Sequence, residues 1–563
     1  MEALDWLVIG VFFLALIGII VWVVRQKQND SADYFLGGRD ATWLAIGASI
    51  FASNIGSEHL IGLAGAGASS GMAMAHWEIQ GWMILILGWV FVPFYTRSMV
   101  YTMPEFLERR YNPQSRTILS VISLVSYVLT KVAVTVYAGG LVFQQVFGIK
   151  ELWGIDFFWI AAIGLVVLTA LYTIFGGMKS VLYTSVLQTP ILLLGSLIIL
   201  VLGFKELGGW DEMMRVCGAV TVNDYGDTMT NLIRSNDDAN FPWLGALIGS
   251  AIIGFWYWCT DQFIVQRVLS GKNEMEARRG TIFGAYLKLL PVFLFLIPGM
   301  IAFALHQKYI AGGEGFLPML ANGTANADAA FPTLVAKLLP AGVKGLVVCG
   351  ILAALMSSLA SLFNSSAMLF TIDFYKRFRP ETPEKKLVGI GQVATVVIVI
   401  LGILWIPIMR SVGDVLYTYL QDVQSVLAPG IAAAFLLGIC WKRTSAQGGM
   451  WGLIAGMVIG LTRLGAKVYY SNAGEVADST FKYLFYDMNW LFFCGWMFLF
   501  CIIVVIVVSL ATKAPTAEKI QGLVFGTATK EQKAATRASW NHWDIIHTVI
   551  ILAITGAFYW YFW

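Results

Sequence analysis

Long apolar segments recur along the whole chain and are separated by short polar loops. Four of them are nearly free of charged residues, namely 4–24, 156–173, 393–408 and 491–510. A helix of about 20 apolar residues spans the hydrocarbon core of a bilayer. Because lipid offers no hydrogen-bond partner to the backbone, such segments are stable there as α-helices. The pattern predicts an all-α polytopic membrane protein.

About fourteen segments have the length and polarity of transmembrane helices. We expect them at 4–24, 42–69, 72–95, 117–147, 154–175, 180–204, 243–268, 279–307, 334–374, 387–408, 411–440, 447–468, 487–511 and 543–562. The longest polar stretches between them, 205–242 and 512–541, are too short and too poor in apolar residues to fold alone. The chain is therefore expected to form one membrane domain.

Composition agrees with this prediction and excludes several function classes. Of the 563 residues, 58% are hydrophobic and only 13% are charged, whereas about a quarter of the residues in soluble domains are charged. The net charge is +3 without a basic tract, so no nucleic-acid partner is indicated. The sequence has no P-loop, no HExxH or GxSxG motif and no Cys/His cluster with metal-ligand spacing. Neither ATP-driven transport nor an enzymatic activity is therefore indicated.

Lysine and arginine residues gather in alternate loops. They are Arg25, Lys27, Arg39, Arg97, Arg109, Arg110, Arg116, Lys179, Lys272, Arg278, Arg279, Lys376, Arg377, Lys385, Lys386, Lys442, Arg443, Lys513 and Lys519. Loops rich in these residues lie on the cytoplasmic side of a membrane. The intervening loops include the acidic segment 205–242 and the Gly- and Ala-rich segment 310–332. We expect a multi-pass protein of the cell membrane with both termini on the extracytoplasmic side.

A polar cluster interrupts the second expected span. Residues 52–59 read Ala-Ser-Asn-Ile-Gly-Ser-Glu-His and are followed by three further glycines. Small and polar residues in this density disfavour an unbroken helix, and a broken helix exposes backbone carbonyls that bind ions and solutes in many transporters. The alternative is a packing face of small residues. Glu58 and His59 favour the binding site, because packing alone does not need ionisable groups.

A second cluster lies in the segment 354–361. Ala354, Ser357 and Ser358 are spaced at i, i+3 and i+4, so they share one face of a helix. Two hydroxyls and a carbonyl on one face suit a small hard cation, which prefers oxygen ligands. Serines at this spacing more often serve helix packing, so the cluster alone does not decide between the two interpretations.

Isolated polar residues inside other expected spans are further candidates, because such residues are costly in a membrane. They are Glu78, Asp261, Lys288 and Gln421. Lys288 could pair with Glu78 or Asp261 and hold two helices together, or it could bind a solute. The aromatic run 255–258 could belong to the core or stack on a ligand. Aromatic faces together with carboxylate, amide and ammonium groups are the elements that recognise carbohydrates.

Several motifs resemble the sodium:solute symporter family, and within it the sodium–glucose cotransporter branch. They are FASNIGS at 51–57, YTIFGGMKS at 172–180, WYWCTDQ at 256–262, MSSL at 356–359 with FNS at 363–365, and PG at 429–430 followed by FLLG at 435–438 and WKR at 441–443. The resemblance runs over nearly the whole chain. It implies a LeuT-type fold with a core of five plus five helices in inverted repeats.

The resemblance also implies an organisation along the chain. A leading transmembrane helix and cytoplasmic loop would occupy 1–41, the first repeat 42–204, an extracellular loop 205–242 and the second repeat 243–440. Peripheral C-terminal transmembrane helices would occupy 441–563.

By position, the resemblance further implies two binding sites. Sodium would bind the backbone carbonyls of Ala52, Ile55 and Ala354 and the hydroxyls of Ser357 and Ser358. A sugar would bind Asn54, His59, Glu78, Lys288 and Gln421, with Tyr257 stacking on its ring as an inner gate and Trp77 as an outer gate.

This sequence departs from the family pattern at three positions. Ser185 stands where several relatives have an Asp linked to a second cation site, which favours one sodium per cycle. Gly254 stands where relatives supply a polar sugar contact, and Glu58 stands where members of the glucose branch can have a small residue.

Taken together, the residues and the resemblance predict a sodium-coupled symporter that imports a glucose- or galactose-type hexose by alternating access. Its partners would be the sugar, sodium as coupling ion and the lipid bilayer. One alternative keeps the fold and changes the solute to inositol, another polyol, an anionic sugar or an amino acid. Another is a sodium-dependent sensor or channel that does not accumulate solute.

Overall fold

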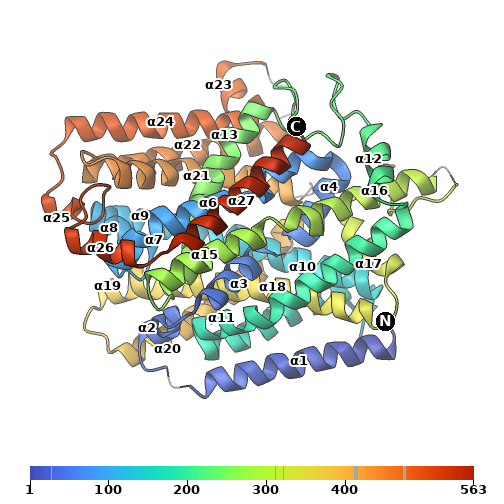
Figure 1. The fold of residues 1–563 in the computed structure, drawn as a ribbon, viewed down its shortest axis with the longest axis horizontal. Coiled ribbons are helices and arrows are strands. Elements are labelled where there is room, and N and C mark those ends of the chain that lie inside the picture. The colour runs from blue at the N-terminus through green and yellow to red at the C-terminus, as the bar shows by residue number, and fades with distance from the viewer. Residues whose placement is uncertain (27, 57, 311, 321–322, 411–415, 473–476) are drawn as a thin grey trace.

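Helices that run in roughly the same direction make up nearly all of the molecule (Figure 1). The computed structural model describes residues 1–26, 28–56, 58–310, 312–320, 323–410, 416–472 and 477–563. Ser57 of the motif 51–57 and the first five residues of the expected span 411–440 lie outside these ranges. Within them, the strands are one antiparallel pair, β1 (Glu151–Leu152) and β2 (Ile155–Asp156).

The outer helices expose apolar side chains. α1 (Ala3–Val24) leaves 71% of Leu14 exposed, α24 (Trp490–Ala511) leaves 58% of Val507 and α27 (His542–Tyr561) leaves 82% of Trp560. Soluble proteins rarely expose contiguous apolar surface on this scale. The exposed residues are therefore suited to contact lipid, in agreement with the predicted class.

Eleven stretches of the described residues are long and apolar enough to cross a membrane. They are Ala3–Val24, Glu58–Ser98, Phe157–Leu207, Trp243–Thr260, Glu274–Ile310, Val343–Phe378, Glu384–Pro407, Gln421–Cys440, Ala446–Ser471, Trp490–Ala511 and His542–Tyr561. The number is smaller than fourteen for three reasons. The expected spans 154–175 and 180–204 are two helices on the two sides of a kink in one continuous stretch, 117–147 lies in the consecutive segments Pro113–Ser126, Tyr127–Val132 and Ala133–Phe147, and 42–69 is broken.

The continuous stretch is α11 (Phe157–Leu207), whose 51 residues exceed what one bilayer crossing needs. Gly177 interrupts it with φ 52° and ψ −149°, a conformation that residues with a Cβ rarely adopt. A Cβ at this position would also lie 2.4 Å from the carbonyl oxygen of Tyr34. The chain therefore turns at Gly177, between the two spans that the sequence predicts.

Two helices are discontinuous near the middle of the bundle. The first consists of α3 (Trp43–Asn54), the π-helical segment η2 (Glu58–Leu63) and α4 (Ala64–Ser70), and Ile55 between them is extended. The second consists of α13 (Trp243–Gly254), η6 (Phe255–Thr260) and α14 (Gln262–Leu269), and Asp261 between them is extended. The predicted interruption in the second span is therefore present.

The other helical elements range from single turns to helices of 27 residues. They are α2 (Ser31–Leu36), η1 (Gly37–Arg39), η3 (Gly71–Met74), α5 (Ala75–Glu78), α6 (Gly81–Ile86), η4 (Leu87–Phe91), α7 (Val92–Ser98), α8 (Met103–Arg110), α9 (Pro113–Ser126), η5 (Tyr127–Val132), α10 (Ala133–Phe147), α12 (Trp210–Gly218), α15 (Glu274–Lys288), η7 (Val292–Leu296), α16 (Ile297–Ile310), η8 (Ala327–Ala329), α17 (Ala330–Leu338), α18 (Val343–Met368), η9 (Leu369–Tyr375), α19 (Lys376–Phe378), α20 (Glu384–Arg410), α21 (Leu416–Cys440), α22 (Ala446–Asn472), α23 (Thr480–Lys482), η10 (Tyr483–Asp487), α25 (Ala517–Ile520) and α26 (Lys530–Ala538).

One expected boundary is wrong. The span 334–374 was predicted to begin within what is a separate short helix, α17, and the long helix α18 begins only at Val343. Pro340 and Gly342 separate the two, and Gly342 has φ 81°. Proline has no amide hydrogen to continue a helix, and glycine allows the positive φ at which the chain turns.

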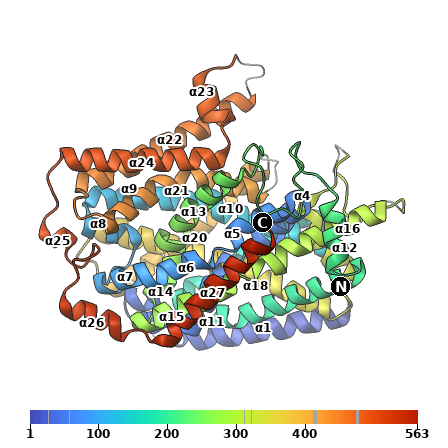
Figure 2. The same cartoon turned by 45° about the horizontal axis from the view of Figure 1, so that its top comes forward.

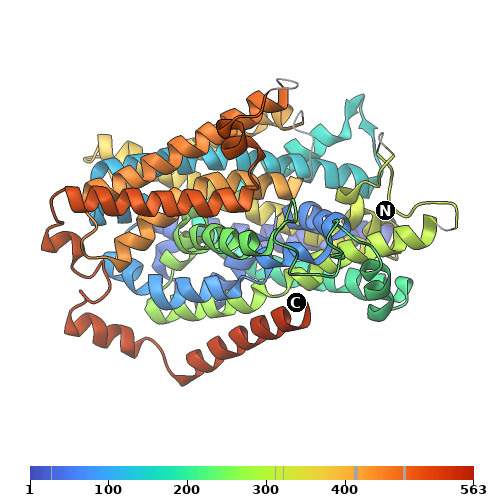
Figure 3. The same ribbon diagram turned by 90° about the horizontal axis from the view of Figure 1, so that it is seen from above.

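The C-terminal helices flank the bundle on two sides. α22 and α24 (orange) lie together with α21 along one side, and α27 (red) lies along the other (Figure 3). α27 crosses the outer face of α6 and α15 (Figure 2). Both termini are tied to the end of the bundle that carries the loops 205–242 and 339–342. Asp5 Oδ1 accepts hydrogen bonds from the amides of Gly342 and Gly345, and the amide of Leu232 donates to the Phe562 carbonyl.

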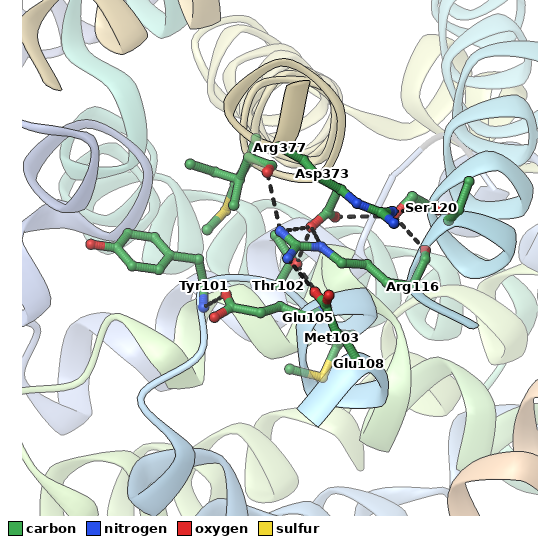
Figure 4. A network of polar contacts seen from close by, with 12 residues as sticks. Tyr101, Thr102, Met103, Glu105, Glu108, Arg116, Ser120, Asp373 and Arg377 are labelled. Atoms are coloured by element: carbon green, nitrogen blue, oxygen red, sulfur yellow. Dashed lines mark hydrogen bonds and ion pairs between the residues drawn. The ribbon is translucent and has the colours of Figure 1, made fainter. Parts of the chain in front are cut away.

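The opposite end of the bundle is held by ion pairs of the basic loops (Figure 4). Arg116, on α9, binds Asp373 of η9 at 2.7 Å and Glu108 of α8 at 2.6 Å. Asp373 also accepts hydrogen bonds from the hydroxyls of Thr102, at 2.8 Å, and Ser120, at 3.1 Å. Because the Asp373 side chain is fully buried, these contacts fix the linker 99–112 against the end of the long helix α18.

We expect Asp373→Asn to lower the thermal stability of the protein in detergent by several degrees. The substitution leaves the largely buried Arg116 with Glu108 alone, and breaking a buried pair costs about 3–5 kcal/mol when no other partner remains. The measurement is the melting temperature from fluorescence-detected size-exclusion chromatography. The matched control is Arg109→Ala, which breaks an exposed pair with Glu105 at 2.9 Å and should change little. Equal melting temperatures for the two variants would contradict the assigned role.

Candidate solute and sodium site

The interruption of the first discontinuous helix brings the polar residues of the segment 52–59 next to α18. α3 ends at Asn54, and the amide of Ile55 still bonds to the Phe51 carbonyl at 2.9 Å before the chain becomes extended. A Cβ on Gly56 would lie 2.6 Å from Glu58 Oε2 and 2.9 Å from Ser358 Oγ. Only glycine leaves room for this close approach, so Gly56 lets the break and α18 share one polar region.

A buried ion pair forms the centre of the candidate solute site. Lys288 Nζ, at the end of α15, lies 2.6 Å from Glu78 Oε2, at the end of α5. The two residues are 3% and 1% exposed. Lys288 also donates to Asn54 Oδ1 at 3.1 Å, and His59 Nε2 lies 3.2 Å from the same Glu78 oxygen. Asn54, His59, Glu78 and Lys288 were predicted to bind the solute, and these contacts connect all four. The sequence left either Glu78 or Asp261 as the partner of Lys288, and the structure shows Glu78.

Tyr257 closes this group on one side. Its hydroxyl accepts a hydrogen bond from Asn54 Nδ2 at 3.2 Å, so it joins the two discontinuous helices where both are interrupted. The ring lies edge-to-face against Trp258 at 4.9 Å. An aromatic ring at this place can pack against the apolar face of a ring-shaped solute, as predicted for an inner gate.

The cavity between these residues is small. It is lined by the predicted residues Asn54, His59, Trp77, Glu78, Tyr257, Lys288 and Gln421, and also by Glu58, Gln80, Ile253, Gly254, Trp258 and Gln424. Its volume of about 40 Å³ holds about three water molecules and is smaller than a six-membered polyol ring. A solute of that size therefore fits only when the lining residues move apart.

Trp77, the predicted outer gate, is held by helices outside the core. Its indole stacks on Trp490 of α24, with ring centres 5.5 Å apart, and meets the edge of Phe241 at 6.1 Å. The neighbouring His76 contacts the Tyr559 hydroxyl of α27 at 3.0 Å and the Leu232 carbonyl at 3.1 Å. The short helix α5 is therefore held in place from two sides, next to the solute cavity.

The predicted sodium residues lie where α3 meets α18. Ser358 Oγ donates to the Ser53 carbonyl at 2.9 Å and lies 3.2 Å from the Ile55 carbonyl. Ser357 Oγ is 3.4 Å from Ser185 Oγ of α11, while Ala52 and Ala354 are buried on the two facing helices. Backbone carbonyls and hydroxyls are the donor set that a hard monovalent cation prefers. The Ser358 hydroxyl and the Ser53 and Ile55 carbonyls, which lie within 3.2 Å of it, therefore fit sodium.

Sequence reasoning did not single out three residues at or beside this region. Gln80 and Gln424 line the cavity. Both are amide side chains inside expected transmembrane spans, where polar groups are costly, and this feature could have identified them from the sequence. Gln80 also fills the space beside Gly254, because a Cβ there would lie 2.5 Å from Gln80 Oε1. The third is Lys131 of η5, whose ammonium lies 2.6 Å from Asp261 Oδ2 and 4.8 Å from the centre of the Tyr257 ring.

Contacts on the side of the basic loops keep α14 against its neighbours. Gln262 Oε1 accepts from the Met103 amide at 2.8 Å, and its Nε2 lies 3.3 Å from the Tyr101 carbonyl. Tyr127 donates to Asp261 in the adjacent break. The half-helix that begins at Gln262 is thereby attached both to η5 and to the linker that Asp373 fixes.

Comparison with known proteins identifies the group to which this arrangement belongs. The family model described as sodium:solute symporter family matches residues 34–456. Sodium/myo-inositol cotransporter 2 of Mus musculus is 37% identical over 542 residues, covering 94% of this chain and 80% of that protein. Sodium/glucose cotransporter 4 of Danio rerio is 36% identical over 537 residues, covering 92% of this chain and 80% of that protein.

Among solved structures, a substrate-bound, outward-open Na⁺-coupled sialic acid symporter resembles the chain. It is 22% identical with a TM-score of 0.72, and the match covers 92% of this chain and 99% of that one. This likeness shows the fold. The family match and the two relatives establish that the chain belongs to the sodium:solute symporter family and is a polytopic membrane protein that couples solute transport to sodium.

Proposed function

We propose that the protein imports a neutral six-membered polyol, a hexose of the glucose or galactose type or an inositol, together with sodium. The observation that carries this proposal is the ion pair of Lys288 with Glu78, surrounded by Asn54, His59 and the cavity-lining Gln421. The pair offers donors and acceptors to a solute, and the charges of its two members balance each other. Such a pair suits several hydroxyl groups without net charge.

Charged solutes fit this cavity less well. An anionic sugar or an amino acid carboxylate would need a cation that is not already paired, and Lys288 is held by Glu78 at 2.6 Å. Binding such a solute would leave the Glu78 carboxylate without its counter-ion in a buried place, which is costly. The names of the two relatives, one a myo-inositol and one a glucose cotransporter, support a neutral polyol.

We propose both a hexose and an inositol as possible solutes, because the contacts around Gly254 differ from the family pattern. The side chain of Gln80 occupies the space that a residue larger than glycine would fill at 254, and its amide also donates to the Ser250 carbonyl at 2.8 Å. We propose that Gln80 supplies the polar contact that position 254 lacks. The preferred arrangement of hydroxyl groups would then depend on this amide.

The proposed mechanism is alternating access. Sodium binds first, bridges the break at Ile55 to Ser358 of α18, and thereby positions Asn54 and His59 for the solute. A ligand shifts a conformational equilibrium only by binding one state better than the other, so sodium must prefer the solute-ready state. With Ser185 in place of an acidic residue, we propose one sodium per cycle. Each charge that crosses contributes about 2.3 kcal/mol per 100 mV, so membrane voltage should drive uptake.

We further propose an orientation and a repeat organisation. The end of the bundle that carries Arg116, Arg39 and Lys519 would face the cytoplasm, since basic loops lie there. The termini, tied to the other end, would be extracytoplasmic in a protein of the cell membrane. The segments 42–204 and 243–440, each of which contains one of the discontinuous helices, would be the two inverted repeats.

The test is uptake of radiolabelled glucose, galactose and myo-inositol into proteoliposomes under an inward sodium gradient, with potassium as control. We expect accumulation of at least one of them above equilibrium. We also expect Gln421→Ala to reduce uptake about 5- to 150-fold, because the loss of a buried amide's hydrogen bonds to a solute costs about 1–3 kcal/mol.

The matched control is Gln392→Ala, which removes an amide on α20 that bonds to the Ile174 carbonyl away from the cavity. This variant should transport normally. Uptake of sialic acid or of amino acids but of none of the three polyols would overturn the proposed solute class. Sodium-dependent current without accumulation would favour the sensor or channel instead.

A further inference from the structure

Glu58 lies between the two predicted binding sites and belongs to neither set of predicted ligands. It is the first residue of η2, directly after the break, and it interacts electrostatically with His59 and Lys131. It lines the solute cavity and also a second, more enclosed cavity of about 20 Å³. That second cavity is bounded by Lys131, Thr135, Tyr257, Phe263 and Ser358, among others. It is large enough for one small ion or water molecule.

The carboxylate of Glu58 lies close to the predicted sodium ligands. Glu58 Oε2 and Ser358 Oγ lie 2.6 Å and 2.9 Å from the same point, the place where a Cβ on Gly56 would stand. The Ser358 hydroxyl is itself 3.2 Å from the Ile55 carbonyl. A carboxylate oxygen and a hydroxyl oxygen therefore border one small volume beside Gly56, and the hydroxyl also reaches the Ile55 carbonyl.

The basic groups nearby have their own acidic partners. Lys288 pairs with Glu78 and Lys131 pairs with Asp261, both at 2.6 Å. Within the part of the chain that the structure describes, no lysine or arginine lies within 4 Å of the Glu58 carboxylate. A carboxylate inside the membrane is costly unless a cation compensates it. The Lys131 ammonium, which borders the same small cavity, offsets part of the Glu58 charge without forming an ion pair with it, and the remainder is available for a mobile cation.

We propose that Glu58 supplies the negative charge of the sodium site. Its carboxylate joins the Ile55 carbonyl and the Ser358 hydroxyl, so that bound sodium is held by one charged and several neutral oxygens. The inference rests on the proposed sodium site and deepens it. Because His59 follows directly and contacts Glu78 at 3.2 Å, a sodium ion that draws Glu58 towards α18 also sets the position of a solute-binding residue. Glu58 thereby links ion binding to solute binding.

The test measures sodium binding directly and without solute, from ²²Na⁺ binding to purified protein in a scintillation proximity assay. We expect Glu58→Gln to raise the sodium half-saturation concentration at least about tenfold, because a neighbouring negative charge is lost. The sodium half-saturation concentration of Glu58→Asp should lie between those of the wild type and Glu58→Gln. At saturating sodium, the KM for the transported solute should stay within about twofold of the wild-type value. Glu212→Gln, which neutralises an exposed acid paired with Arg215, is the matched control.

The outcomes separate this inference from the proposed function. An unchanged sodium half-saturation in Glu58→Gln would overturn the inference, and a changed solute KM with unchanged sodium binding would assign Glu58 to the solute instead. Glu58→Gly, which restores the small residue of the glucose branch, replaces Glu58→Gln if the latter fails to fold. If the wild type binds sodium in a Glu58-dependent manner but transports none of the polyols, the proposed solute is wrong and the role of Glu58 stands.

Discussion

Lys288→Ala abolishes solute uptake and lowers the melting temperature of the protein. The substitution removes the ammonium group that lies 2.6 Å from Glu78 and 3.1 Å from Asn54 Oδ1. Glu78 is 1% exposed, and breaking a buried pair by removing one partner costs about 3–5 kcal/mol. Both the solute contacts and the local structure should therefore be lost together.

A double variant separates the two effects. Glu78→Gln with Lys288→Gln removes both charges and keeps side chains that can hydrogen-bond, so the melting temperature should return close to the wild-type value. Uptake should not return, because neither an ammonium nor a carboxylate remains for the solute. Uptake by Lys288→Ala with an unchanged KM would contradict a solute role for Lys288. A double variant that transports normally would show that the pair serves only to hold the helices.

Ser358→Ala has the second-largest expected effect, on sodium rather than on solute. Its hydroxyl lies between the Ser53 carbonyl at 2.9 Å and the Ile55 carbonyl at 3.2 Å, where α18 meets the interrupted helix. Interactions of a polar group with a charge contribute about 1.5–3 kcal/mol. Their loss corresponds to an increase of about 10- to 100-fold in the sodium concentration at half-maximal uptake. The measurement is solute uptake as a function of external sodium at constant ionic strength.

The control comes from the same face of α18. Ser361 lies three residues further, and its hydroxyl contacts Ser53 Oγ at 2.7 Å instead of the predicted sodium ligands. Ser361→Ala should keep the wild-type sodium dependence within about twofold. If the two variants shift the sodium dependence equally, the serines of α18 serve packing, which is the alternative that their spacing leaves open.

The fold was largely predictable because apolar length and polar interruptions follow directly from the bilayer. The bend at Gly177 and the break after Asn54 lie where the sequence predicts them. The start of α18 was missed because the residues around Pro340 are as apolar as the helices on either side.

The site was predictable where a polar residue stands out from an apolar segment. Asn54, His59, Glu78 and Lys288 come from three parts of the chain and meet within hydrogen-bonding distance. The role of Lys131 was not predictable, because its partner Asp261 lies 130 residues away and no periodicity relates the two. The position of Gln80 was not predictable either, because its side chain occupies space that is free only because residue 254 is a glycine.

The aromatic stack of Trp77 on Trp490 has a practical consequence for engineering. A truncated chain that ends after the proposed second repeat, at residue 440, would lose both Trp490 and the Tyr559 hydroxyl that contacts His76. Such a shortened chain would keep every residue of the proposed solute and sodium sites, yet the indole of Trp77 would lose its support. Grafting this core onto the C-terminal helices of a relative would require Trp77 and its stacking partner to be exchanged as a pair.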